Sequence, residues 1–297
     1  MICLKPLRNE KFVARTHSKK LPIRVDKKKV GSGSYNIVYR ATVRPPCKDT
    51  DKKIIFRRSK DTIDSVKLFN QEVRMTIKMA EAGAGPELYR AGLDERERGF
   101  MIMEYYPSSI RQLMDLPKNK RPTWSQLERG LRIPIKKMAK AGIFCSDLKF
   151  RNAVLRTTSA SSWEMKLIDF GDDFCAFRDD IIIPDRYIKP YQDKIRKGKM
   201  KQFDMENILY GAMLMMMSIN SEKTRKRVYG ESTRPLFAQE IQKLPMETKL
   251  LALILIGQGK SRTGMAKPIA QARHYYKGTI VNADKMYEIL TGETLKK

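Results

Sequence analysis

The sequence predicts an α+β protein in two parts, a small β-sheet with one helix followed by a mainly helical region. Two observations carry this prediction. Short alternating apolar segments separated by turn residues occupy the chain up to Glu104, and longer segments with apolar residues at helical spacing follow from Ile110. The length of 297 residues suffices for one large domain or two smaller lobes, and a hydrophobic content of 41% is enough for a packed core.

The sheet is expected to begin at Lys29. Lys29–Val43 alternates around a glycine-containing turn and predicts strand–turn–strand, and Lys53–Arg58 predicts a third short strand. Val66–Ala82 carries apolar residues every three or four positions, which predicts the helix. Leu88–Ala91 and Gly99–Met103 flank a charged turn and predict a hairpin.

The remainder of the chain is expected to be mainly helical, with short strands near Ala153–Leu155 and Met165–Ile168. The expected helices are Ile110–Leu116, Trp124–Ala141, Met205–Ile219, Leu236–Leu244, Met246–Gln258 and Asp284–Leu290. The predicted organisation is a basic N-terminal extension over residues 1–28, a sheet-containing lobe over 29–104 and a helical lobe over 105–297.

The net charge of +27, from 60 basic and 33 acidic residues, is the unusual bulk property. A field of this sign attracts acidic proteins, nucleotide phosphates and nucleic acid. The basic residues are spread along the chain, and the sequence contains no helix-turn-helix, zinc-finger or RNP signature. Acidic protein substrates are therefore expected, and a non-specific association with nucleic acid stays open.

A cytoplasmic or nuclear location is expected. The longest apolar stretch, Ile208–Ile219, is too short to span a bilayer, and the N-terminus lacks a sustained apolar region typical of a signal peptide. The four cysteines are scattered without a CxxC pair. That pattern argues against a disulfide framework and a zinc site, and it favours a reducing compartment. The cysteines are Cys3, Cys47, Cys145 and Cys175.

The strongest chemical signal is a set of four polar residues, Asp147, Lys149, Asn152 and Asp169. Phosphoryl transfer needs a carboxylate that orients the attacking hydroxyl and accepts its proton, a cation near the moving phosphoryl group, and oxygen ligands for Mg²⁺. Asp147 and Lys149 supply the first two, and Asn152 and Asp169 supply the magnesium ligands. Gly171 follows Asp169 closely, and one β-hairpin would fill the interval between the two motifs.

A glycine-rich segment between the first two expected strands provides a second, weaker signal. Gly31 and Gly33 would let backbone N–H groups approach phosphates closely. A plain hairpin turn would have the same composition, so this segment alone does not decide between the two readings.

Taken together, these motifs resemble those of the eukaryotic-type protein kinase superfamily over about residues 25–220. The resemblance implies a bilobal fold, ATP and Mg²⁺ as cofactors, and transfer of phosphate to protein hydroxyls. Lysine two positions after Asp147 resembles the serine/threonine type. Glu72 corresponds to the glutamate of the N-lobe helix, and Met103 to the residue at the back of the adenine pocket. The implied ATP-binding residues are Gly31, Ser32, Gly33, Ser34, Val38, Ile55, Arg57, Glu72, Met103, Glu104, Tyr105 and Tyr106.

Arg57 stands where the family has a lysine that binds phosphates and pairs with the helix glutamate; a slip of one residue would place Arg58 there. Arginine keeps the charge and can clamp a carboxylate or phosphate, but it is planar and bulkier, so the exchange is not conservative. Lys60 could replace this lysine by charge, but strand alternation places it on the face opposite to that of Ile55 and Arg57.

Control by phosphorylation of the activation segment is not expected. Ser146 replaces the arginine that grips a phosphorylated loop, and no serine or threonine occurs between Gly171 and Asp204. Asp204 resembles the aspartate that anchors the catalytic loop from a C-lobe helix. The motif surroundings are also similar to kinases of large DNA viruses, for which a virion-associated location is an option.

Three other interpretations remain. A pseudokinase or nucleotide-binding scaffold is supported by Arg57. A small-molecule kinase of the aminoglycoside or choline type has a related layout, but rarely carries lysine two positions after the base. A nucleic-acid-binding protein would make the motif match accidental.

Overall fold

The computed structural model describes residues 4–8, 21–33, 35–45, 47, 52–62, 66–159, 162–171, 174–181, 183, 185–198, 204–230 and 234–258. The chain divides into two compact units. Unit 1 comprises Met1–Pro107 and Lys166–Asp172, and unit 2 comprises Ser108–Met165 and Asp173–Lys297. The predicted boundary at residue 104 lies close to the observed one, but the short segment that contains Asp169 belongs to unit 1.

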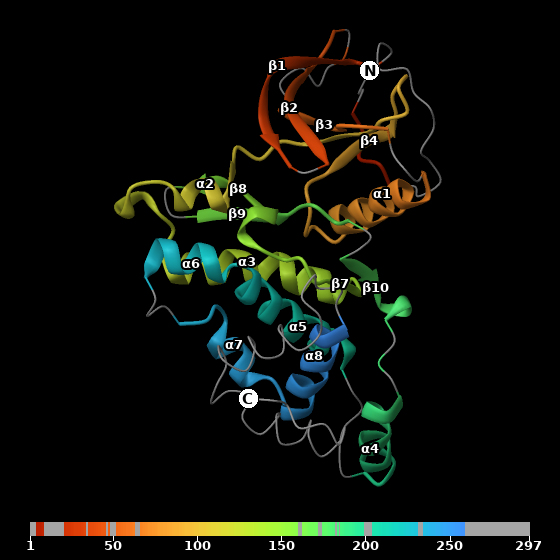
Figure 1. Ribbon diagram of the computed structural model, residues 1–297, viewed down its shortest axis with the longest axis vertical. Coiled ribbons are helices and arrows are strands. Elements are labelled where there is room, and N and C mark those ends of the chain that lie inside the picture. The colour runs from red at the N-terminus through yellow and green to blue at the C-terminus, as the bar shows by residue number, and fades with distance from the viewer. Residues whose placement is uncertain are drawn as a thin grey trace. The chain divides into compact units, whose positions relative to one another are not determined.

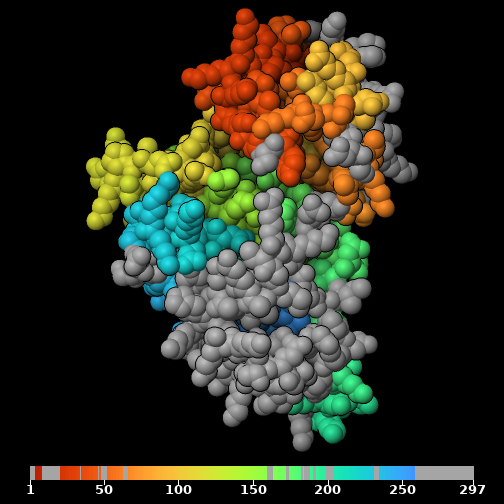
Figure 2. Space-filling model, in the orientation of Figure 1, coloured from red at the N-terminus to blue at the C-terminus, as the bar shows by residue number. Residues whose placement is uncertain are grey.

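The alternating segments of unit 1 form one antiparallel five-stranded sheet in the order β1-β2-β3-β5-β4 (Figure 1). Its strands are β1 Ile23–Ser32, β2 Asn36–Val43, β3 Ile54–Ser59, β4 Leu88–Leu93 and β5 Gly99–Glu104. β1 is an edge strand and is largely exposed after Ile23, so its lysines form part of the surface of unit 1 (Figure 2). Charged side chains on an edge strand hinder pairing with another chain.

The two faces of this sheet carry different cores. Ile54 and Phe56 of β3 point into one buried cluster, while Ile55 packs against a second cluster that includes residues of α1, Val66–Glu81. Side chains alternate across a strand, so Arg57 shares the α1 face with Ile55. The register pairs Arg57 with Val38 on one side and Met101 on the other, which fixes its place at the centre of the sheet.

The N-terminal part of unit 1 differs from the prediction. β1 begins at Ile23, and Leu4 and Leu21 are buried in the same cluster as Ile54. The Leu7 N–H donates to the Leu88 carbonyl, 2.6 Å away, and Arg8 forms an ion pair with Glu87. Residues 4–8 and 21–28 therefore belong to the folded unit, and the predicted extension over 1–28 is wrong for them. Isolated apolar residues in a basic stretch gave no periodic pattern.

Unit 2 is mainly helical, as predicted. Its helices are α2 Ile110–Met114, α3 Trp124–Lys140, α4 Asp185–Arg196, α5 Met205–Asn220, α6 Glu222–Tyr229, α7 Ala238–Lys243 and α8 Met246–Gln258. Short 3₁₀ turns at Lys118–Lys120, Phe150–Asn152 and Arg178–Asp180 lie between α2 and α3, between β7 and β8, and between β10 and α4. α5 is buried on every side over its central turns, so it forms the core of this unit.

Two helices of unit 2 were not predicted and one prediction cannot be compared. α4 and α6 are rich in charged residues and low in apolar residues overall, so neither segment stood out in the sequence. The helix expected at Asp284–Leu290 lies outside the described residues. In the described part of the chain, no helix is long and apolar enough to cross a membrane.

The described part of the chain also carries five short strands in two small sheets. β6 Ser108–Ser109, β8 Ala153–Ser159 and β9 Ser162–Leu167 form one sheet, and β7 Ile143–Cys145 pairs antiparallel with β10 Cys175–Phe177. β8 and β9 are adjacent, which confirms the predicted hairpin between the two motifs.

β7 and β10 are joined by a disulfide between Cys145 and Cys175, which lie directly opposite in the register. The prediction of unpaired cysteines is wrong. Pairing of these two strands brings together two thiols that are 30 residues apart in the sequence. The spacing of the cysteines along the chain does not reveal this proximity. No described cysteine carries a free thiol, so the cysteine pattern no longer argues for a reducing compartment.

Candidate functional site

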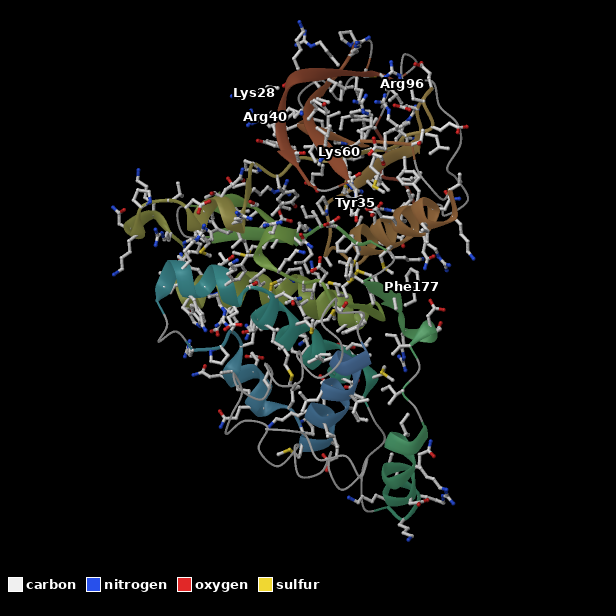
Figure 3. All side chains as sticks on the ribbon, viewed as in Figure 1. Lys28, Tyr35, Arg40, Lys60, Arg96 and Phe177 are labelled. Carbon is white, nitrogen blue, oxygen red and sulfur yellow. A yellow bond between two sulfur atoms is a disulfide. The ribbon has the colours of Figure 1, made fainter. Side chains whose placement is uncertain are left out.

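The glycine-rich turn joins β1 to β2 in unit 1. The Gly33 N–H donates to the Asn36 carbonyl at 2.9 Å, and Lys60 N–H donates to the Tyr35 carbonyl at 2.9 Å. Figure 3 shows Tyr35 and Lys60 near one another beside this turn. Ser32 is the last residue of β1, while Ser34 lies outside the described residues.

Neither Gly31 nor Gly33 is required by packing within the chain. A Cβ at Gly33 would meet no atom within 4 Å, and one at Gly31 would be 3.9 Å from the Cβ of Val38. Neither glycine has the positive φ that favours this residue type. The turn therefore leaves space above its backbone that a side chain could fill.

Arg57 of β3 forms the central ion pair of unit 1. Its Nη2 atom lies 2.6 Å from Oε1 of Glu72 on α1 and 3.8 Å from Oδ1 of Asp169. Nη1 also donates to the Met101 sulfur at 3.5 Å. Burial disfavours the charged guanidinium, but the carboxylates of Glu72 and Asp169 outweigh this effect and raise the pKa of Arg57. Arg57 is therefore a permanent cation between two predicted site residues.

The alternative positions for this cation do not form the pair. Lys60 follows the end of β3, is exposed, and makes no ion pair with Glu72 in the part of the chain that the structure describes. Arg58 points to the opposite face of the strand from Arg57 because side chains alternate.

Asp169 is held by the segment around it. The Leu167 N–H donates to the Ala84 carbonyl at 2.9 Å, and the Lys166 ammonium donates to the Gly83 carbonyl at 2.8 Å. A Cβ at Gly85 would lie 3.1 Å from the Cβ of Met79 and 3.3 Å from the buried Phe170 ring, so glycine allows close packing at this turn. Asp169 itself has φ 69°, a left-handed conformation that is uncommon outside glycine and often marks functional sites.

The predicted adenine-binding residues lie along β5 and the residues after it. Met103 is buried and packs in the second core cluster with Ile55, so it serves the core as well as this face of the sheet. The Glu104 N–H donates to the Glu87 carbonyl and the Tyr105 N–H to the Lys53 carbonyl. Those two donors are used by the sheet and do not remain for a ligand.

The face that carries these residues extends onto β2. Arg40 is paired with Ile55 and Val38 with Arg57, so all four residues share one face of the sheet. The Arg40 guanidinium lies 5.1 Å from the centre of the Tyr105 ring, a cation–π contact. Val38, Ile55 and Tyr105 were predicted to bind ATP, whereas Arg40 was not, because its position on this face follows only from the register.

In unit 2, residues 146–152 form a segment that we term the Asp147 loop. The Lys149 ammonium lies 2.5 Å from Oδ2 of Asp147. The side-chain amide of Asn152 donates to the Asp147 carbonyl at 3.1 Å and to its Oδ2 at 3.3 Å. These three predicted residues thus form one cluster. Ser146 donates from its N–H to the Phe174 carbonyl at 2.8 Å, which ties the start of the loop to the residue before β10.

Two residues at the end of α5 contact this loop and were not predicted. The Asn220 side-chain amide donates to the carbonyls of Ser146 and Leu148, and Ser221 accepts from the Phe150 N–H. The prediction that Asp204 anchors the loop is wrong. Asp204 caps the other end of α5, where it accepts from Asn207. The C-terminal end of α5 contacts the loop, whereas Asp204 lies at its N-terminal end. Only the tertiary structure shows which end of the helix faces the loop.

The predicted site residues thus form two clusters, one in each unit. Arg57, Glu72 and Asp169 lie together in unit 1, and Asp147, Lys149 and Asn152 lie together in unit 2. Among the described residues, no group of three or more His, Cys, Asp or Glu side chains could hold a metal ion. No family model and no curated protein matches the sequence.

Proposed function

We propose that the chain is a bilobal, protein-kinase-like enzyme that transfers the γ-phosphate of ATP, with Mg²⁺, to serine or threonine hydroxyls of proteins. The observation that carries this proposal is the Arg57–Glu72 ion pair with Asp169 in reach of the same guanidinium. Arg57 of β3, Glu72 of α1 and Asp169 of the segment Lys166–Asp172 meet there. Each stands in the sequence at a position that corresponds to a residue of the family motif. Scattered charged residues would not be expected to coincide in this way.

The glycine-rich turn supports nucleotide binding in unit 1. Backbone conformation and packing within the chain leave Gly31 and Gly33 unexplained, and the open space at Gly33 is explained by close approach of a phosphate. Val38, Ile55 and Met103 supply an apolar face for a purine, with Tyr105 and Arg40 at its edge.

The Asp147 cluster supplies the acceptor chemistry. In the proposed reaction, Asp147 orients the acceptor hydroxyl and takes its proton, and Lys149 offsets negative charge at the transferred phosphoryl group. Asn152 fixes the loop through its amide N–H groups, and this orientation leaves its amide oxygen as an acceptor.

The residues present fit a magnesium ion bound with the nucleotide. In unit 1, Asp169 has a carboxylate that is 54% exposed, and in unit 2, Asn152 has an amide oxygen; each by itself is an oxygen donor of the kind that Mg²⁺ prefers. Mg²⁺ usually takes one or two protein carboxylates and completes its shell with phosphates and water, so a dedicated cluster of acids is not needed. Bound Mg²⁺ would neutralise charge on the phosphate oxygens.

The substrate and its control are also part of the proposal. The charge of +27 favours acidic protein substrates. The absence of serine and threonine from residues 172–203 excludes a serine or threonine switch in that segment. We therefore propose an enzyme that is active without activation-segment phosphorylation.

A nucleotide-binding pseudokinase is the second candidate, and one observation favours it. A single nitrogen of Arg57 faces both Glu72 and Asp169, so the carboxylates compete with phosphate for this cation. The planar guanidinium cannot adjust as a lysine ammonium does.

An assay with γ-labelled ATP, Mg²⁺ and a panel of acidic protein acceptors distinguishes these candidates. The wild-type chain is compared with Arg57→Lys, Arg57→Ala and, as a matched exposed cation, Lys60→Ala. If the chain is an active enzyme, the wild type and Lys60→Ala will transfer label to the acceptor, and Arg57→Ala will not. Transfer that appears only in Arg57→Lys would establish the pseudokinase. No transfer by any of these proteins would refute the proposed activity.

A further inference from the structure

Asn220, the last residue of α5, contacts the Asp147 loop on both sides of Asp147. Its Nδ2 atom lies 2.7 Å from the Ser146 carbonyl oxygen and 3.2 Å from that of Leu148. A carboxamide nitrogen carries two hydrogens, so one side chain satisfies both carbonyls. The two accepting carbonyls belong to the residues immediately before and after Asp147.

Ser221 extends this contact. Its hydroxyl accepts from the Phe150 N–H at 3.1 Å, and the residue is 1% exposed. Ser221 is itself fixed because its N–H donates to the Met217 carbonyl at the end of α5. The last residue of α5 and the cap residue after it therefore hold three backbone groups of the five-residue stretch 146–150.

The backbone of the Asp147 loop depends on side-chain amides in place of a strand ladder. The carbonyls of residues 146 and 148 bond to Asn220, and the carbonyl of Asp147 bonds to Asn152. Loss of the Asn220 amide would leave two carbonyls without these partners. The peptide planes on either side of Asp147 could then rotate, and the direction of its carboxylate would change with them.

We propose that Asn220 is a positioning residue for the phosphoryl-transfer reaction, acting by fixing the backbone on both sides of Asp147. This inference rests on the proposed function, since it assigns a role in that reaction. Asn220 does not touch the reacting groups. It holds the catalytic carboxylate within the tolerance of roughly 0.5 Å that an active site requires.

The reaction kinetics of Asn220→Ala and Asn220→Ser test this role, with Asn207→Ala as the matched control. Asn207 has the same side chain and lies on the same helix, but among the described residues its side chain bonds to Asp204 and not to the Asp147 loop. A displacement of about 1 Å can lower a rate by about 100-fold. We expect kcat to fall between about 10- and 100-fold in Asn220→Ala, and less in Asn220→Ser, which keeps one donor. The KM for ATP should stay within about twofold of wild type in both variants.

A purely structural role for Asn220 would give a different result. The folded fraction of each variant, measured by circular dichroism at the assay temperature, would then account for the whole loss of activity. That outcome, or an unchanged kcat in both Asn220 variants beside an active wild type, would overturn the inference alone. If Asn220→Ala does not fold, Asn220→Ser decides by the same criteria. An inactive wild type would refute the proposed function and this inference with it.

Discussion

Removing the disulfide between Cys145 and Cys175 should destabilise unit 2 by a measurable amount. The bond joins residues 30 positions apart, and closing a loop of that size removes about 3.6 kcal/mol of chain entropy from the unfolded state at 25 °C. β7 and β10 share only three residue pairs, and an isolated two-stranded ribbon is marginally stable in water. Pairing of the strands will therefore not replace the covalent bond.

The double variant Cys145→Ala/Cys175→Ala tests this prediction in urea unfolding without reductant. Both tryptophans, Trp124 and Trp163, belong to unit 2, so their fluorescence reports its unfolding. The free energy of unfolding should fall by about 3.6 kcal/mol, and somewhat more because two buried sulfur atoms are removed from the core.

The change should appear mainly in the urea midpoint. A decrease below about 1 kcal/mol would show that the bond does not constrain the unfolded chain as the loop length requires. A disulfide-linked pair of peptides in a non-reducing digest provides the independent control that the bond exists in the wild type.

Three further predictions concern charged groups. Glu72→Gln should destabilise unit 1 by about 3 kcal/mol, because the buried guanidinium of Arg57 then has only the more distant carboxylate of Asp169 beside it among these two acids. An unchanged thermal unfolding temperature would contradict a stabilising role of the Arg57–Glu72 ion pair. Asp94→Asn should lower stability by about 2 kcal/mol at neutral pH. Burial opposes the charged carboxylate, but bonds from Arg98 and from backbone N–H groups outweigh it and lower the Asp94 pKa, so this stability is lost as pH falls below the ordinary value of 3.8. The difference from Asp94→Asn should therefore shrink in acid unfolding, and a constant difference would refute the assignment. Replacing the lysines at 27–29 by glutamine should reduce the slope of the logarithm of the nucleic-acid binding constant against the logarithm of salt concentration, by about 0.7–0.9 for each phosphate that these lysines neutralise. An unchanged slope would show that nucleic acid binds elsewhere on the chain.

The regular elements that flank the site could be predicted because their signals are local. Lys53–Arg58 alternates as the observed β3 does, and Val66–Ala82 has the periodicity of α1. These two elements carry Arg57 and Glu72. Side-chain alternation along the strand was therefore enough to choose Arg57 in preference to Lys60, and Arg57 forms the observed ion pair with Glu72.

The missed contacts of the site and of the disulfide all depend on residues that are distant in the sequence. Arg40 joins the face of Ile55 through strand register, and Cys145 meets Cys175 through pairing of two three-residue strands. Asn220 reaches the Asp147 loop because of the direction in which α5 packs. The sequence shows that each side chain is polar or reactive, but tertiary packing determines its partner.

Phosphate transfer by Asp147→Asn tests the central claim most directly. This substitution keeps the size of the side chain but removes the carboxylate that would accept the hydroxyl proton. Asp115→Asn is the control, since Asp115 is an exposed residue of unit 2 that pairs with Arg227. We expect wild type and Asp115→Asn to transfer the γ-phosphate of ATP to serine or threonine of a protein acceptor, and kcat to fall at least about 100-fold in Asp147→Asn. Equal transfer by Asp147→Asn, or none by the wild type, would contradict the account.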